Sequence, residues 1–525
     1  MIKESQPLNG TVWKLLTLTL ILLMGIGEVC HSQTRSPRMA YTVSFPDPAS
    51  HAYQVQLNTS GWNVDFVDFK MPQWMPGYYQ IMNYSKDVAL LVALDDRGKK
   101  LPVEQINDHT WRISNIKNKT FHLTYTIRTS KQFVANSYVD ISHAYLIPEN
   151  SFLYVDGYLS LPVIVKMDTH PGWSQVATGL EPIVGKRNEF SAPDFNVLYD
   201  CPILAGTLEE LPSFKVNGIE HRFLGYQIGS FDKVHFMQDM EKIVRASIDI
   251  FGDIPYARYS FIAMGPGRGG IEHLNNTTFG FDGNSLDQPS AYLKMMNFLA
   301  HEYFHHYNVK RIRPFELGPF DYEKGSRTNQ LWVSEGISVY YEYLLVRRAG
   351  IINGETLLSL FEANISHHEN NPGRMYQSLA QASYSTWKDG PFGSQGEDPK
   401  KSISYYEKGP IVGLFLDLAI RNATHNDKSL DDVMKLLYKR YYKLEGRGFT
   451  DAEFQQTCEE VSNISMTGFF EYIYTTRELD YSTYLGYAGL KFEIETTDQV
   501  RKISIHKMAS PGTLQSTILH SWLGE

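Results

Sequence analysis

The first part of the chain alternates apolar and polar residues in short runs. Tyr53-Gln54-Val55-Gln56-Leu57 is one such run, and residues 121–127 form another. A period of two residues places one face of a strand against a core and the other toward solvent. Turn-forming residues such as Pro46-Asp47-Pro48 separate the runs. The pattern predicts a β-rich domain over residues 40–212.

From about Phe231 onward the apolar residues recur at helical spacing instead. Five of them lie three or four residues apart, as on the buried face of one helix: Val234, Met237, Met240, Val244 and Ile248. The same period predicts further helices over residues 355–367, 408–421 and 428–443. These segments favour a second, mostly α domain over residues 213–484. The whole chain is therefore predicted to be a multidomain α+β protein.

Two later segments are assigned by their local chemistry. Thr450 and Glu453 match a capping box, so Asp451–Val461 is predicted to form a helix. Residues 371–403 are rich in Gly, Ser and Pro, and we expect them to form a loop.

Composition and charge restrict the class of protein. The chain has 525 residues, enough for about two to four domains, and its 42% hydrophobic content is ordinary for a globular protein. A formal net charge of −9, without a basic stripe, argues against nucleic acid as a partner. Three cysteines are too few for a disulfide framework. The sequence does not decide whether Cys201 and Cys458 pair.

The run His301-Glu302-Tyr303-Phe304-His305 supplies the first candidate chemistry. It is an HExxH motif in a segment that is predicted to be helical, so His301 and His305 project from one face. Two imidazoles at that spacing can hold zinc, and Glu302 beside them can take a proton from water at the metal. The alternative is a surface helix with two solvated histidines.

A third metal ligand is expected from the segment Leu331–Gly336. Catalytic zinc needs three protein ligands and one open position. Glu335 lies among apolar residues of a predicted helix, including Trp332 and Ile337. A carboxylate in such surroundings is unfavourable unless it is paired or bound to a metal. Glu335 is therefore the candidate third ligand, and an exposed helix glutamate is the alternative.

Two further segments flank these motifs. Gly269 and Gly270 allow the backbone to approach a ligand closely, and the Glu272 carboxylate after them can hold a cation. Tyr406 opens an apolar helix, and its hydroxyl can donate to the oxyanion of a tetrahedral intermediate. Tyr405, the preceding residue, is the alternative candidate for this role. Without the metal motif, a turn and a packed aromatic helix start are the simpler interpretations.

The order of these segments resembles the glycyl aminopeptidase family of zinc metallopeptidases, whose members usually carry a C-terminal PDZ domain. The resemblance rests on residues 269–273, 301–314, 332–336 and 406–410, together with Met71–Tyr79 near the N-terminus. The stretch that follows the HExxH motif, up to Pro314, makes the resemblance much more specific than that motif alone.

This resemblance implies a thermolysin-like catalytic domain and a role for each candidate residue. The zinc ligands of the family are matched by three residues: His301, His305 and Glu335. Glu302 matches the general base. Tyr406 matches the transition-state tyrosine of the related larger aminopeptidases. Glu272 matches the glutamate that binds a free α-amine in those relatives. The resemblance also implies one Zn²⁺ per chain and a preference for Gly or Ala as the first residue of a peptide.

The two ends of the chain carry further expectations. Lys3 and Lys14 precede a short apolar core, which predicts a signal peptide over residues 1–32 and a secreted or periplasmic protein. The core is too short to favour a permanent membrane span, and Cys30 lies in a poor context for lipid attachment. Residues 485–525 begin as family PDZ domains do but are too few for a complete one. We therefore expect an incomplete PDZ-like segment there, explained by truncation or a changed reading frame.

Together these features predict a secreted zinc aminopeptidase that acts on peptides. A zinc endopeptidase with the same core is one alternative, and it differs only in not requiring a free N-terminus. A peptide-binding protein that has lost the chemistry is the other. The sequence does not determine the oligomeric state.

Overall fold

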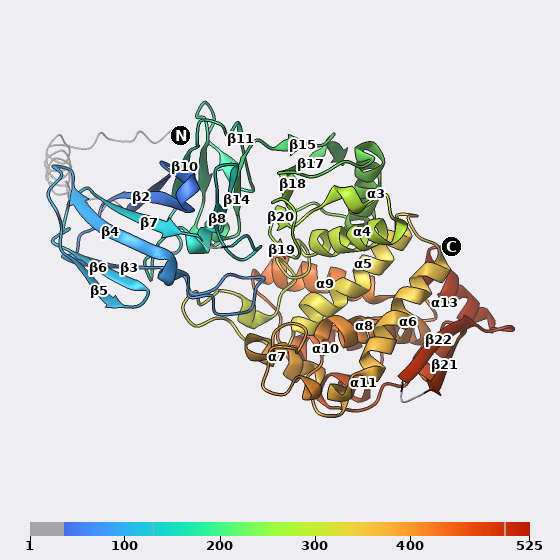
Figure 1. The fold of residues 1–525 in the computed structure, drawn as a ribbon. Helices are drawn as coiled ribbons and strands as arrows, with labels where there is room; N and C mark the ends of the chain where they lie inside the picture. The colour runs from blue at the N-terminus through green and yellow to red at the C-terminus, as the bar shows by residue number, and fades with distance from the viewer. Residues whose placement is uncertain (1–35, 130, 498–499) are drawn as a thin grey trace, which may run out of the picture.

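The computed structural model describes residues 36–129, 131–497 and 500–525. Within them the chain forms a β-rich N-terminal part followed by a mainly helical second part (Figure 1). The predicted signal peptide lies outside the described residues. Of the helices in the described ranges, none combines the length and apolar character that a membrane crossing requires.

Among the described residues, the N-terminal part contains three sheets, in agreement with the predicted β-rich domain. A seven-stranded sheet has the order β12-β13-β10-β1-β2-β7-β4, a four-stranded sheet the order β11-β14-β9-β8, and a three-stranded sheet the order β3-β6-β5. The alternating run at Tyr53 lies in β2 (Ala52–Ser60), which pairs antiparallel with β7 (Phe121–Arg128). Within the run from Tyr53 to Leu57 the apolar side chains are buried and the polar ones exposed, as a period of two requires.

The remaining strands of this part follow in chain order. Their bounds are β1 (Arg38–Ser44), β3 (Phe66–Lys70), β4 (Val88–Asp95), β5 (Val103–Asn107), β6 (Thr110–Ser114), β8 (Tyr138–Val139), β9 (His143–Leu146), β10 (Val163–Asp168), β11 (Gln175–Thr178), β12 (Glu181–Pro182), β13 (Glu189–Ala192) and β14 (Ile203–Gly206). The short helix α2 (Phe195–Tyr199) precedes β14.

The second part begins with a six-stranded sheet that the hydropathy pattern did not predict. Its order is β15-β17-β18-β20-β19, with β16 also paired to β17. The strands are β15 (Glu209–Glu210), β16 (Phe214–Val216), β17 (Ile219–Gly225), β18 (Arg258–Ala263), β19 (Gly270–Glu272) and β20 (Asn276–Phe279). β17, β18 and β20 are parallel, and β18 is buried almost throughout. Strands buried on both faces lack the alternation that marks a half-exposed strand, so the period gave no signal.

Helices make up most of the rest of the second part. Their bounds are α3 (Lys233–Phe251), α4 (Pro289–Phe304), α5 (Ile337–Arg348), α6 (Gly354–Asn370), α7 (Leu379–Asp389), α8 (Tyr405–Ala423), α9 (Leu430–Leu437), α10 (Asp451–Ser462), α11 (Thr467–Tyr474) and α12 (Tyr481–Gly486). The capping box at Thr450 and Glu453 is confirmed. The loop predicted over residues 371–403 is wrong in part, because α7 lies within it. A second capping box, Ser378 with Gln381, begins that helix.

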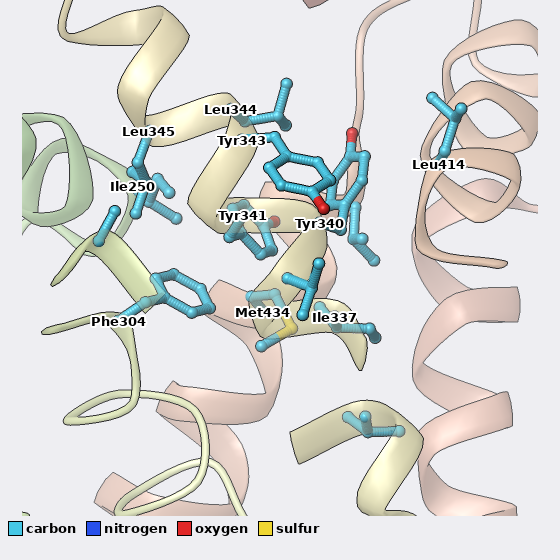
Figure 2. Packing of buried hydrophobic residues seen from close by; sticks show 14 of the residues in the cluster. Ile250, Phe304, Ile337, Tyr340, Tyr341, Tyr343, Leu344, Leu345, Leu414 and Met434 are labelled. Atoms are coloured by element: carbon cyan, nitrogen blue, oxygen red, sulfur yellow. The ribbon is translucent and has the colours of Figure 1, made fainter. Parts of the chain in front are cut away.

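Helix α5 lies at the centre of the core of the second part. Figure 2 shows its side chains directed toward Phe304 of α4 and Met434 of α9. The rings of Tyr341 and Phe304 stack with their centroids 4.4 Å apart. This packing joins α4, which carries most of the HExxH motif, to α5, which directly follows the segment Leu331–Gly336.

The C-terminal segment is a hairpin and a helix rather than an identifiable PDZ domain, so the PDZ-like prediction is not confirmed. Strands β21 (Leu490–Thr497) and β22 (Val500–Lys507) pair antiparallel beside α6, and α13 (Thr513–Leu523) follows (Figure 1). The Trp522 indole is buried and donates to Tyr340 Oη at 3.0 Å. The segment is therefore packed into the core of the second part.

The sequence did not decide whether Cys201 and Cys458 form a disulfide, and in the structure they do not. Cys201 is buried in the core of the N-terminal part and Cys458 in that of the second part, and both are free.

Candidate metal centre

Three predicted ligand residues converge on one point at the end of α4. The Nε2 atoms of His301 and His305 are 2.8 Å apart. Glu335 Oε2 lies 3.5 Å from the first and 3.3 Å from the second. All three side chains are buried, and their ligand atoms lie within 4.8 Å of one another.

An oxygen atom lies close to the Nδ1 atom of each histidine. His305 Nδ1 donates to the backbone oxygen of Asn308 at 2.7 Å. Glu342 Oε2 lies 3.0 Å from His301 Nδ1. With the ring protons on Nδ1, both Nε2 lone pairs and the Glu335 carboxylate face the same space. A cation satisfies that arrangement, and two imidazoles with one carboxylate are a donor set that suits zinc.

The two glutamates at the centre differ in their acidity. Burial opposes ionisation of Glu335, but the adjacent His305 and His301 hold the pKa of its carboxyl well below the ordinary value. Burial raises the pKa of Glu302 to about 7, against the lowering effect of the same two histidines. Glu335 is therefore an anion, whereas Glu302 can exchange a proton near neutral pH.

Glu335 lies on a π-helical turn, Trp332–Gly336, that runs directly into α5. The prediction of a helix is confirmed, but its first turn is wider than an α-helix. π-Turns are frequent at functional sites because the extra residue re-aims a side chain.

Two glycines bring this turn against α8. A Cβ added at Gly336 would lie 2.6 Å from the Cα of Gly409, so the two backbones are in direct contact. The approach places Tyr406, at the start of α8, with its Oη donating to Glu335 Oε2 at 2.9 Å. The alternative, Tyr405, bonds instead to Thr386 Oγ1 at 3.0 Å. The structure therefore brings Tyr406 and not Tyr405 to the candidate metal ligand.

Glu302 lies against the edge strand β19. Thr277 Oγ1 donates to Glu302 Oε2 at 3.3 Å. A Cβ added at Gly270 would lie 2.7 Å from the Glu302 carboxylate, so any other residue there would have to displace that side chain. Gly269 has a φ of +84°, which favours glycine, and its added Cβ would meet Val134 at 3.4 Å. Of these two glycines, Gly270 is the one in contact with the centre.

Glu272 ends β19 and is only 4% exposed. Its carboxylate has no hydrogen-bond partner among the described residues. A loop of the N-terminal part covers it, because a Cβ added at Gly77 would lie 3.0 Å from Glu272 Oε2. Glu272, Gly77 and Tyr79 line a cavity of about 80 Å³. Residues of both parts of the chain therefore build this side of the site.

Two residues that contact the candidate ligands, Asn308 and Glu342, were not predicted from the sequence to have a role in the site. Asn308 is buried, and its Nδ2 donates to Val333 O at 2.8 Å and Ser338 Oγ at 3.1 Å, which ties the end of α4 to the turn bearing Glu335. Glu342 follows Glu335 by seven residues, two helical turns on the same face. That spacing is the sequence feature from which a position of Glu342 near the site could have been predicted.

Comparisons with known proteins agree with this geometry. The family model described as the Peptidase M61 N-terminal domain matches residues 40–207, and that described as M61 glycyl aminopeptidase matches residues 294–412. Together they span more than half of the chain. No curated protein matches it.

Several solved structures share its fold. An aminopeptidase N family protein from Idiomarina loihiensis is 28% identical with a TM-score of 0.82, covering 87% of this chain and 79% of that chain. Yeast LTA4 hydrolase in complex with bestatin is 15% identical with a TM-score of 0.52, covering 86% and 69%. A mutant M1 zinc metallopeptidase from Deinococcus radiodurans, bound to a Tyr-Ser-Ala substrate, is 14% identical with a TM-score of 0.51, covering 85% and 95%. The family matches and the first of these structures show that this chain is a metallopeptidase that belongs to the M61 glycyl aminopeptidase family.

Proposed function

We propose that this protein is a zinc aminopeptidase that removes small first residues from peptides. The observation that carries the proposal is the position of Glu272: a buried carboxylate with no hydrogen-bond partner among the described residues, two residues from the glycine that contacts Glu302. A buried carboxylate of this kind is unfavourable unless a cation meets it. The α-ammonium of a peptide is such a cation.

His301, His305 and Glu335 would hold the zinc ion, with Asn308 and Glu342 orienting the imidazoles. Bound there, zinc would supply the Lewis acidity that polarises a peptide carbonyl and activates water for attack.

The chain's own residues then move the protons. Glu302 takes a proton from the attacking water and delivers it to the leaving amine. Tyr406, whose hydroxyl lies 2.9 Å from Glu335 Oε2, donates to the oxyanion that develops on the substrate. Both side chains are held in place before substrate arrives, Glu302 by Thr277 and Tyr406 by the contact of two glycine backbones.

The preference for Gly or Ala is supported by the family model described as M61 glycyl aminopeptidase, which matches residues 294–412, and the cavity beside Glu272 is compatible with it. At about 80 Å³ it has room for only a few water molecules. An α-ammonium on Glu272 would leave space for a short first side chain.

The test compares zinc-loaded protein on one Ala-first peptide, with its N-terminus free or acetylated. We expect the free peptide to be cleaved far faster. Glu272→Ala should lower kcat/KM for the free peptide by roughly 10- to 150-fold, the range of one charge-assisted hydrogen bond, and leave the acetylated peptide almost unaffected. Equal cleavage of both peptides by the wild type would establish the endopeptidase alternative. Binding without hydrolysis would establish the peptide-binding alternative.

The metal is tested separately by elemental analysis. We expect about one zinc ion per chain, and loss of both zinc and activity in His305→Ala. Full zinc content and full activity in that variant would refute the assignment.

We also propose that residues 1–32 are removed on export from the cytoplasm, as their basic flank and short apolar core suggest. N-terminal sequencing of the exported protein should begin near Gln33. A protein that keeps Met1 and stays in the cytoplasm would contradict this.

A further inference from the structure

The cavity beside Glu272 contains a buried ion pair that the proposed chemistry does not use. Lys310 follows the metal-binding helix, and its Nζ lies 2.5 Å from Asp200 Oδ1. The two side chains are 8% and 9% exposed. Lys310, Asp200 and Glu272 all line the same cavity. A lysine is seldom buried unless its ammonium is paired, so the position of Asp200 decides where Lys310 lies.

Asp200 is held firmly by groups of the second part. It follows α2 of the N-terminal part, and its Oδ2 accepts from the backbone N–H of Leu274 at 2.6 Å. His273 Nδ1 lies 3.4 Å from its Oδ1. Both of these residues come directly after Glu272. The two carboxylates of the cavity, Asp200 and Glu272, therefore keep a fixed relation to each other.

The acidic and basic side chains that line the cavity are equal in number. Asp200 and Glu272 are its two acidic groups, Lys310 and Arg313 are its two basic groups, and the ammonium of Lys310 is paired with Asp200. Burial opposes that ammonium, but the neighbouring Asp200 and Glu272 raise the pKa of Lys310, so it stays charged. The α-ammonium of a peptide would pair with Glu272, and a basic first side chain would meet Lys310 and Arg313 with no free carboxylate to accept it.

We propose that Lys310 is a specificity-determining residue: its side chain occupies, on Asp200, the place that a basic first side chain of a substrate would otherwise take. The proposal rests on the aminopeptidase function proposed above. Lys310 thereby both shortens the cavity and neutralises its second carboxylate, which restricts the first residue to short, uncharged side chains. If Lys310 is shortened, a lysine supplied by the substrate restores the charges that the wild-type cavity has with an Ala-first peptide.

The first experiment measures kcat/KM on three peptides that differ only in their first residue: Ala, Lys or norleucine. In Lys310→Ala, the Lys-to-Ala ratio should rise by about 10-fold or more over the wild type, the effect of one new charge-assisted hydrogen bond to Asp200. The matched control is Lys310→Ala combined with Asp200→Asn, which keeps the new space but removes the charge. In that control the norleucine-to-Ala ratio should rise, whereas the Lys-to-Ala ratio should not.

A second measurement does not depend on catalysis. Butylammonium has the length and charge of a lysine side chain, so it should fill the vacated place in Lys310→Ala and raise its melting temperature. The double variant, with no carboxylate at position 200, should show no such shift. Since Lys310→Ala leaves Asp200 unpaired, this variant should be less stable than the wild type in the absence of butylammonium. Butylammonium should bring its melting temperature back toward that of the wild type.

Three results would overturn the proposal. One is a folded Lys310→Ala with the wild-type Lys-to-Ala ratio and no response to butylammonium. Another is a double variant whose norleucine-to-Ala ratio is unchanged. The third is a wild type that prefers an Asp-first peptide to an Ala-first one, since Lys310 would then bind the substrate. A wild type that cleaves no Ala-first peptide refutes the proposed function instead, and the butylammonium measurement still tests the role of Lys310.

Discussion

Gly270→Ala should disable the proposed general base without touching a metal ligand. The added methyl group points at the Glu302 carboxylate, and its Cβ would lie 2.7 Å from both Cδ and Oε1. It would also lie 2.7 Å from Phe298 Cζ, so the methyl group has no free direction. The Glu302 carboxylate is the far end of a side chain that can rotate, and the backbone around it can stay in place. The carboxylate must therefore move, and so must the Phe298 ring, whose Cζ is likewise the far end of a side chain.

The distances determine how far the carboxylate moves. An ordinary contact of a Cβ begins at 3.4 Å, so the carboxylate must shift by roughly 0.7 Å from its position at 2.7 Å. It would also leave its hydrogen bond from Thr277 Oγ1, which is already 3.3 Å long. A misplacement of about 1 Å at a reacting group costs on the order of 10²-fold in rate. We expect Gly270→Ala to lower kcat by about that factor.

The assay is steady-state hydrolysis of an Ala-first peptide, with zinc content and thermal melting measured on the same samples. Gly267→Ala is the matched control, because it lies in the same segment and its added Cβ would meet nothing closer than 3.6 Å. Gly270→Ala should keep the zinc content and the fold of the wild type, and Gly267→Ala should keep the rate as well. Wild-type kcat in Gly270→Ala would refute the reasoning, as would loss of zinc, because the methyl group would then act through the ligands.

Three further changes test other parts of the structure. Tyr406→Phe removes the donor to Glu335 and should lower kcat by roughly 10²-fold at unchanged zinc content; unchanged kcat would exclude Tyr406 as the oxyanion donor. Burial raises the pKa of Glu149, whose two oxygens have no partner among the described residues, so its contribution to stability is complete below about pH 4.5 and is lost as the pH rises through the raised pKa. Glu149→Gln should therefore melt higher than the wild type at pH 8 but not at pH 4, and equal differences at both pH values would contradict this. Trp522→Ala removes a buried indole from the core beside Tyr340 and should cost about 3–5 kcal/mol of stability, seen as a lower melting temperature; no change would mean that the C-terminal segment folds separately.

The sequence by itself determined the local chemistry of this protein. The HExxH spacing places His301 and His305 one helical turn apart whatever surrounds them, because the period of the α-helix is a local property. The alternating run at Tyr53 and the capping box at Thr450 are local in the same sense, and both are present in the structure. Glu335 could be named in advance because a carboxylate among apolar residues needs a partner.

Local hydropathy patterns did not predict strands whose two faces are both buried. β18 lies inside a sheet and shows no alternation, and β17 beside it ends in three consecutive buried residues, so the sheet that carries Glu272 was not predicted. A composition rich in Gly, Ser and Pro concealed α7, whose start depends on one capping box.

Only the tertiary structure decided which residues meet. The choice of Tyr406 over Tyr405 depends on the contact between Gly336 and Gly409, which are 73 residues apart in the chain. The cover of Gly77 over Glu272 and the pair of Asp200 with Lys310 each join the two parts of the chain. Such contacts follow from how sheets and helices pack, and packing depends on the shapes of side chains distant in sequence. The chain pattern therefore identified the candidate metal ligands, whereas the walls of the cavity became visible only in three dimensions.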